Sequence, residues 1–365
     1  MYKLFFLICC FFFCVLPCKG LTTSGDAVIL MEEKSGRVLY SKNINKQKLI
    51  ASTTKIMTAV LAIESNQLDD VVTIDESILK AYGSNIYIQI GEEMTLRDLV
   101  YGLMLRSGND AALAIANHLG GLEHFVKKMN EKALEIGMKK TTFINPHGLD
   151  EDKSNISTAY DMALLTRYAK RYDEYSKIAG TKKHIVKTNY KTYAWTNKNK
   201  LLTSYKYTTG GKTGYTEKAR RTLVTTASKN NLDLIVVTLN DGDDWNDHKK
   251  LYEYGFDNYR NYKVLNKNKF KIESDYYKED LYIEDNYYYP LKPTETNNMS
   301  LKIKLEKIKK YKNKDKVGVV EVYYQDDLVH IENVYIKVPN YPKKSIWQII
   351  AEWFKRWLIY YGFYL

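Results

Sequence analysis

The sequence contains no cysteine after residue 18. Its four cysteines, Cys9, Cys10, Cys14 and Cys18, all lie in one N-terminal segment. From residue 19 onward the chain therefore has no thiol that could form a disulfide, attack a substrate or bind a metal. Covalent catalysis by this part of the chain would need a different nucleophile.

Apolar runs long enough to span a membrane comfortably are also lacking. The apolar run at residues 4–16 follows Lys3 and is too short for a comfortable transmembrane helix. A positive start, a short apolar core and small residues at the end are typical of a secretory signal peptide. We predict a signal peptide at residues 1–20, cleaved near Gly20, with an uncleaved N-terminal anchor as the alternative. Pro17 argues against a lipoprotein cleavage box.

Patterns for metal and phosphate binding are missing too. The six histidines show no metal-ligand spacing, and the chain has no glycine-rich phosphate loop. We therefore predict no metal and no cofactor.

The composition is that of an ordinary globular protein, with 45 % apolar and 27 % charged residues and a net charge of +12. Lys and Arg are scattered, and Tyr, Asn and Lys are all abundant. This pattern favours a general compositional bias, and we expect no nucleic-acid partner. Attraction to anionic polymers or lipid head groups is the alternative.

Residues 21–262 are predicted to form one domain, in which helices are enclosed by a sheet whose strands come from both ends of this stretch of the chain. Residues 27–43 have the pattern of a β-hairpin, and two alternating segments around Asn230-Asn231 predict another pair of antiparallel strands. The apolar spacing predicts helices at residues 52–64, 95–105, 110–119 and 157–170.

The composition changes at about Lys263. Residues 263–342 contain short alternating segments and polar turns, which predict a small β domain. Its basic run, residues 302–316, is interpreted as a solvated strand face and loop. Residues 343–365 predict an amphipathic helix with three tryptophans on or near an apolar face, and we expect it to lie on a membrane surface without crossing it. A helix docked on the β domain is the alternative.

Three short motifs are candidates for catalysis. They are Ser52-x-x-Lys55, Ser107-x-Asn109 and Lys212-Thr213-Gly214. Each pattern also occurs elsewhere in the chain, for example at Ser77-Ile-Leu-Lys80, so none is specific alone. Only this set combines a Ser-x-x-Lys that opens a buried helix, a Ser-x-Asn between two apolar helices and a Lys-Thr-Gly on a strand.

The first motif suits nucleophilic catalysis. A serine hydroxyl is a poor nucleophile until a base takes its proton. Residues three apart share one helix face, so Ser52 Oγ can meet Lys55 Nζ. Burial lowers the pKa of a lysine and makes its neutral amine available as a base. A helix cap at Ser52 with a solvated lysine is the simpler alternative, but it leaves a lysine inside an apolar helix unexplained.

The three motifs together resemble the active-site serine penicillin-recognising enzymes. The segments "YGLMLRSGNDAA", "NPHGLD", "STAYDMALLTRYA" and "GGKTGYT" are similar to the low-molecular-mass D-alanyl-D-alanine carboxypeptidases, and other stretches are closest to the sporulation-type enzymes of Gram-positive endospore formers. The resemblance implies an α/β catalytic domain of the β-lactamase type, an antiparallel sheet with a helical cluster, followed by a small all-β domain and an amphipathic helix. Many relatives have Ala-Gly where this chain has Ala219-Arg220.

The resemblance also implies roles for the motif residues. Ser52 would be the nucleophile, Lys55 its base and Ser107 a second proton carrier. Asn109 would bind the substrate peptide and steady Lys55, although a helix cap would also explain Ser107 and Asn109. Lys212 and Thr213 are expected to bind the terminal carboxylate of the substrate, and Gly214 to let the substrate approach the strand closely. The backbone N–H groups of Ser52 and Tyr215 would form the oxyanion hole. His147 is expected to pack its loop.

We therefore expect a secreted, membrane-associated serine carboxypeptidase that removes the terminal D-alanine from peptidoglycan stem peptides and is acylated by β-lactams. A β-lactamase is one alternative, but Gly108 replaces the Asp of the commonest class and we find no equivalent of its deacylating Glu. A non-catalytic wall-binding scaffold is the other.

Overall fold

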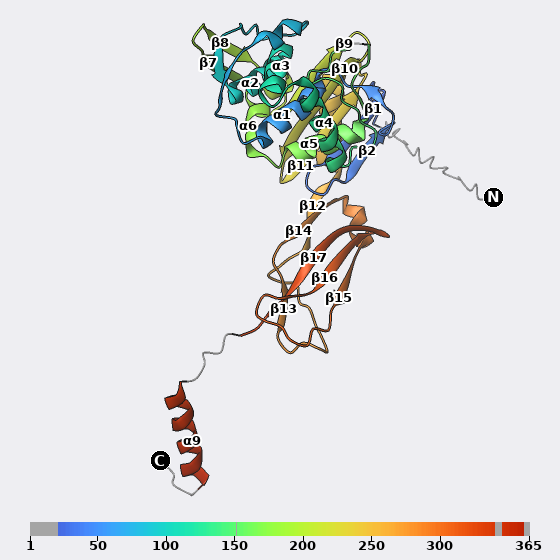
Figure 1. Ribbon diagram of the computed structural model, residues 1–365. Helices are drawn as coiled ribbons and strands as arrows, with labels where there is room; N and C mark the ends of the chain where they lie inside the picture. The colour runs from blue at the N-terminus through green and yellow to red at the C-terminus, as the bar shows by residue number, and fades with distance from the viewer. Residues whose placement is uncertain (1–20, 151, 340–344, 361–365) are drawn as a thin grey trace, which may run out of the picture. The chain divides into compact units, whose positions relative to one another are not determined.

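The computed structural model describes residues 21–150, 152–339 and 345–360 (Figure 1). These residues form two compact units that divide between Arg260 and Asn261. The predicted signal peptide lies outside the described residues.

The first unit is built on a five-stranded antiparallel sheet in the order β2-β1-β11-β10-β9. Asn230 and Asn231 both have positive φ, 53° and 61°, which suits the tight turn between the last two strands in the sequence. The predicted pairing of both ends of the domain is confirmed. The strands are β1 (Ala27–Glu32), β2 (Val38–Lys42), β9 (Thr208–Thr216), β10 (Arg220–Lys229) and β11 (Leu232–Leu239).

Helices cover both faces of this sheet. Ile29 and Met31 of β1 belong to the large core shared with most of the helices, whereas Val28 and Leu30 pack with Leu251 of α8 on the opposite face. Alternate side chains of a strand point to opposite faces, so one strand serves both cores. The helices are α1 (Lys55–Glu64), α2 (Leu96–Tyr101), α3 (Asn109–His118), α4 (Leu122–Ile136), α5 (Ala159–Ala169), α6 (Asp173–Gly180), α7 (Leu201–Ser204) and α8 (Asp244–Asn258).

Short elements connect these layers. Three two-stranded ribbons pair β3 with β6, β4 with β5 and β7 with β8. These elements, with the short helical turns, are β3 (Lys48–Leu49), β4 (Val71–Thr73), β5 (Glu93–Thr95), β6 (Ile156–Ser157), β7 (Lys183–Lys187), β8 (Thr192–Thr196), η1 (Ala51–Thr54), η2 (Glu76–Lys80) and η3 (Gly102–Arg106).

Two predicted helices differ from the structure near the candidate motifs. The α-helix predicted from Ser52 begins only at Lys55, and Ser52 lies in the 3₁₀ turn η1. The helix predicted at 95–105 is α2 followed by the π-helical turn η3. Both departures lie at the candidate motifs, and local hydrophobic spacing does not report such changes of helix type.

The second unit has a four-stranded antiparallel sheet in the order β13-β17-β16-β15 and a two-stranded sheet of β12 and β14. Its own core includes Leu265, Val320 and Ile336. The elements are β12 (Arg260–Leu265), β13 (Asp280–Ile283), β14 (Tyr287–Leu291), η4 (Pro293–Asn298), β15 (Met299–Leu305), β16 (Lys316–Tyr324) and β17 (Asp327–Lys337).

The chain continues into helix α9 (Ile346–Tyr360), whose side chains are almost all exposed. Among the described residues, no helix combines the length and the apolar character needed to cross a membrane.

Candidate active site

The turn that carries Ser52 has an unusual backbone. Ala51 has φ 46°, a left-handed conformation that costs an L-residue energy. Gly148 lies against it, because a Cβ on Gly148 would be 1.9 Å from the Ala51 carbonyl oxygen. Only glycine permits this approach, so the "NPHGLD" loop holds the turn in the shape that presents Ser52.

Lys55 is the first residue of α1 and is fully buried. Its Nζ lies 3.1 Å from Ser52 Oγ, 2.6 Å from Asn109 Oδ1 and 2.6 Å from the His147 carbonyl oxygen. Residues 52 and 55 lie on one side of the 3₁₀ turn, since side chains three apart are eclipsed in that geometry. The structure thus joins the first two motifs and the "NPHGLD" loop at one amine.

The surroundings of Lys55 disfavour its charged form. Burial lowers the pKa of Lys55 well below its usual value, and the positive charges of Lys212 and Lys198 lower it further, while Asp110 opposes them. Burial also lowers the pKa of His147 to about 3, with a smaller effect from Lys55. A neutral amine beside a serine hydroxyl is the arrangement that a general base requires.

Ser107 follows the π-helical turn and has φ 67°, again left-handed. π-Helical turns are rare and often occur at functional sites. Lys212 Nζ donates to Ser107 Oγ at 3.0 Å and to the Thr213 carbonyl oxygen at 2.7 Å. The second motif therefore contacts the third directly, across 105 residues of sequence.

Asn109 and Asp110 organise this region from the start of α3. Asn109 is 1 % exposed, and its Nδ2 donates to the Tyr82 carbonyl oxygen at 2.5 Å while its Oδ1 holds Lys55. The Asp110 carboxylate accepts from the backbone N–H groups of Ile86 and Tyr87, at 3.0 and 2.7 Å. Asn109 Oδ1 thus accepts a hydrogen bond from Lys55 Nζ, whereas the contact of Asn109 with substrate stays a prediction.

The third motif lies on β9, the edge strand of the sheet, as predicted. Lys212 is 1 % exposed, and burial lowers its pKa to about 7, with a further contribution from Lys198. A Cβ on Gly214 would lie 2.3 Å from Thr222 Oγ1 and 3.0 Å from Ser52 N. This glycine therefore lets the turn that carries Ser52 pack against the strand, whereas the predicted approach of substrate stays a prediction.

A cleft of about 460 Å³ opens at this point. Ser52 and Ser107 line it together with the edge strand, and Tyr215 is 58 % exposed there. Arg221 pairs with Tyr215 across β10 and β9, and its guanidinium forms an ion pair with Asp244. The lining residues are Ser52, Ser84, Ser107, Lys198, Thr213, Gly214, Tyr215, Arg221, Asp244 and Trp245.

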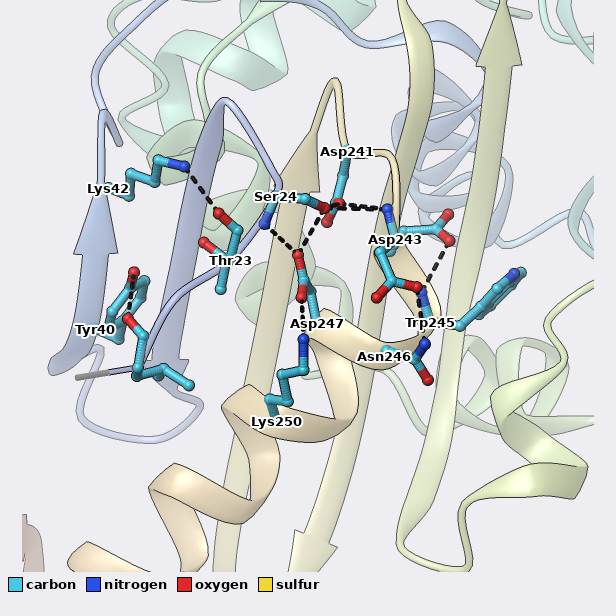
Figure 2. Close-up of polar contacts among 12 residues, drawn as sticks. Thr23, Ser24, Tyr40, Lys42, Asp241, Asp243, Trp245, Asn246, Asp247 and Lys250 are labelled. Atoms are coloured by element: carbon cyan, nitrogen blue, oxygen red, sulfur yellow. Dashed lines mark hydrogen bonds and ion pairs between the residues drawn. The ribbon is translucent and has the colours of Figure 1, made fainter. Parts of the chain in front are cut away.

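Hydrogen bonds fix the start of α8 at the edge of this cleft. Figure 2 shows Ser24 between Asp241 and Asp247: its backbone N–H donates to Asp247 Oδ2 at 2.5 Å, and its hydroxyl contacts both carboxylates. Asp243 N donates to Ser24 Oγ at 3.0 Å. Trp245 points away from this cluster (Figure 2). The N-terminal segment of the domain thus positions one wall of the cleft.

Within the ranges that the structure describes, no group of His, Cys, Asp and Glu side chains is arranged to hold a metal ion. The aspartates near Ser24 contact that serine, Arg221 and Lys250 instead.

Residues 18–243 match the family model described as D-alanyl-D-alanine carboxypeptidase. The chain belongs to this family of serine peptidases. The predicted family is thereby confirmed, and so is the predicted fold of an antiparallel sheet with helices and an added β domain.

Several relatives illustrate the match. The D-alanyl-D-alanine carboxypeptidase DacF of Bacillus subtilis is 39 % identical over 224 residues, which cover 60 % of this chain and 57 % of that protein. DacB2 of Mycobacterium tuberculosis is 32 % identical over 235 residues, covering 62 % and 81 %. The crystal structure of penicillin binding protein 5 from Haemophilus influenzae has a TM-score of 0.72 at 27 % identity and covers 87 % of this chain and 97 % of that one.

The departure from the family pattern at Arg220 has a structural context. Its φ is 59°, a left-handed value that glycine adopts without strain. The position therefore suits a glycine, and this chain holds an arginine there in a left-handed conformation.

Sequence reasoning missed several residues of the site. It did not assign the His147 carbonyl, Asp110, Arg221 or Trp245. Asp110 follows Asn109 directly, and the register of the β9–β10 hairpin would have placed Arg221 beside Tyr215. The contact of Trp245 with the cleft depends on the packing of α8, which no local pattern predicts.

Proposed function

We propose that this chain removes the terminal D-alanine of peptidoglycan stem pentapeptides through an acyl-enzyme on Ser52. The observation that carries the proposal is the environment of Lys55 Nζ. Asn109 Oδ1 and the His147 carbonyl, both at 2.6 Å, are acceptors only. A neutral amine has two N–H groups for them, and its lone pair is left for the hydroxyl proton of Ser52, 3.1 Å away.

Acylation follows from this geometry. Lys55 takes the hydroxyl proton while Ser52 Oγ bonds to the carbonyl carbon between the two D-alanines. The backbone N–H groups of Ser52 and Tyr215 stabilise the oxyanion. The C–N bond then breaks while the proton held by Lys55 is relayed through the Ser107 hydroxyl to the leaving amine, which returns Lys55 to its neutral form, and D-alanine departs. Water hydrolyses the ester and restores Ser52.

Lys212 and Thr213 are proposed to bind the terminal carboxylate of the substrate. The support is their position on an edge strand, where a peptide can pair as an added strand beside the nucleophile. A stem peptide that ends in an amide should then be a poor substrate. Equal turnover of the amide and the acid would give this pair another role.

The decisive assay incubates the purified protein with a stem pentapeptide and measures free D-alanine. Release of D-alanine together with a long-lived penicillin adduct is the expected result. Rapid turnover of penicillin would instead identify a β-lactamase. Neither activity, in a protein shown to be folded, would identify a scaffold.

We also propose that the enzyme acts outside the cytoplasmic membrane, in cell-wall or spore-cortex peptidoglycan, held at the membrane by α9. Its apolar side includes Ile350, Trp353 and Trp357, and its polar side includes Lys355 and Arg356. Tryptophan suits the interfacial layer, and basic residues suit anionic head groups.

Truncation after Pro342, followed by cell fractionation, tests this location. The shortened enzyme should leave the membrane fraction and still release D-alanine from a soluble pentapeptide. Retention in the membrane fraction would exclude α9 as the anchor, and loss of folding would favour a helix docked on the β domain.

A further inference from the structure

The β domain carries a strongly basic strand and loop. Residues 302–316, which run from β15 into the first residue of β16, contain eight lysines and only two acidic residues, Glu306 and Asp315. All eight lysines are exposed. The eight lysines are Lys302, Lys304, Lys307, Lys309, Lys310, Lys312, Lys314 and Lys316.

Three of these lysines have acidic neighbours. Lys304 forms an ion pair with Glu321, and Lys302 lies opposite the same glutamate across β15 and β16. Lys307 shares a pocket with Glu273, Asp275 and Glu306. The excess positive charge is therefore concentrated on the loop after β15.

We call residues 309–314 the basic loop; it contains Lys309, Lys310, Lys312 and Lys314. Two acidic side chains near it accept hydrogen bonds from groups of the loop itself. The Asp315 carboxylate accepts from Lys312 N at 2.6 Å, and Glu279 accepts from the Tyr311 hydroxyl at 2.8 Å.

The basic loop is an ordered turn fastened to the end of β17. Lys314 N donates to the Ile336 carbonyl at 2.8 Å, and Val338 N donates to Asn313 Oδ1 at 3.1 Å. The loop thus lies beside the point where the chain leaves the β domain toward α9. Only five residues separate Pro339 from Ser345, and an extended chain of that length spans about 20 Å.

We propose that the basic loop is a second membrane contact, which binds the phosphate head groups of anionic phospholipids. The ammonium groups of lysine are compact point charges that suit phosphates without a shaped pocket. A bilayer is favoured over a soluble polyanion because the chain leads from this end of the domain directly to α9. The inference rests on the proposed role of α9, to which it adds a headgroup preference.

The test compares binding of the full chain to phosphatidylcholine vesicles with and without phosphatidylglycerol, at low and high salt. The variant replaces all four loop lysines, Lys309, Lys310, Lys312 and Lys314, by Gln. Each basic residue near an anionic surface strengthens binding several-fold, so the variant should bind phosphatidylglycerol vesicles at least about tenfold more weakly. Its binding to phosphatidylcholine, supported by α9, should not change.

A control variant removes the same charge from the catalytic domain, with Gln at four exposed lysines: Lys139, Lys182, Lys183 and Lys187. Its affinity for phosphatidylglycerol vesicles should fall by less than about twofold. Equal losses of vesicle affinity in the two variants would show that only the net charge of the chain matters and would contradict the proposal. Unchanged affinity in the loop variant would also overturn it. Loop-dependent binding of soluble polyphosphate but not of vesicles would assign the loop to a wall polyanion instead.

Two further measurements separate this proposal from those above. Release of D-alanine from a soluble pentapeptide should be the same in all variants, because the loop lies outside the catalytic domain and the four control lysines do not line the cleft. Failure of that assay in the unmodified chain would contradict the proposed activity and leave the lipid result standing. Equal binding of the α9-truncated and full chains would contradict the role of α9, and therefore also the inference that rests on it.

Discussion

The catalytic domain and the β domain use the same side chain in opposite ways. Lys55 and Lys212 are buried and contact fixed acceptors, and burial lowers the pKa of both. Lys309, Lys310 and Lys312 are exposed on a loop. Burial converts a lysine into a proton acceptor at a defined position, whereas exposure keeps it charged and adaptable. A lysine's chemistry is thus decided by its surroundings.

The largest effect is expected from removing the hydroxyl of Ser52, whose proton Lys55 is proposed to accept. Ser52→Ala should abolish covalent penicillin labelling and release of D-alanine, because the acyl-ester has no other oxygen to form on. Intact-mass spectrometry after incubation with penicillin measures the label. Ser77→Ala, in the second Ser-x-x-Lys pattern, is the matched control and should label normally; an adduct that persists without Ser52 would identify a different nucleophile.

The second effect tests whether Lys55 works as a base or only as a cation. Lys55→Arg places a permanent positive charge at this position, and guanidinium does not give up its proton, so acylation should slow by at least about 10²-fold. Stopped-flow acylation with a chromogenic β-lactam gives the rate. Lys80→Arg, at an exposed lysine of η2, should change nothing. Near-normal acylation by the Lys55 variant would make Lys55 a structural cation.

The pH dependence separates the two buried lysines. Lys55 must be neutral to act, so activity should rise with pH through its lowered pKa. Lys212 must be charged to bind a carboxylate, and its pKa is lowered to about 7, so kcat/KM should fall as pH rises above about 7. Lys212→Arg, if active, should lose the falling limb. A falling limb that persists in that variant would assign it to another group.

A smaller effect is expected at the far wall of the cleft. Arg221→Gln leaves the Asp244 carboxylate, which is 6 % exposed, without its cation and should lower the free energy of unfolding by about 1–2 kcal/mol. Its neighbour gives the opposite sign: Arg220→Gly relieves a left-handed residue and should raise that free energy by about 0.5 kcal/mol. Denaturant titration measures the free energy of unfolding of both variants. A change of the same sign in the two variants would contradict this account.

The smallest effects should come from the exposed lysines. Single Gln substitutions at Lys309, Lys310 or Lys312 should change the free energy of unfolding by less than about 0.5 kcal/mol, since no packing or buried contact is lost. Thermal melts of the three variants provide the check. A loss of several degrees would show that the basic loop carries structural contacts after all.

Much of the fold follows from local patterns. The hairpins around Asn230 and at residues 27–43 form where alternation and turn residues place them. Thr158 caps α5 through the N–H of Asp161, as the serine–threonine pair at its start suggests. The turn η1 and the π-helical η3 are different, because their shapes depend on contacts with segments far away in sequence, such as Gly148 against Ala51.

The spacing of Ser52 and Lys55 determines that the two can meet, because three residues bring side chains to one side of a helical turn. The order of the three motifs is enough to indicate the family. Only the folded chain decides that Lys55 is buried between Asn109 and the His147 carbonyl, and that Lys212 contacts Ser107. The pKa of a lysine depends on solvent exclusion and on charges brought from distant segments, and both exist only after the helices and the sheet have packed together.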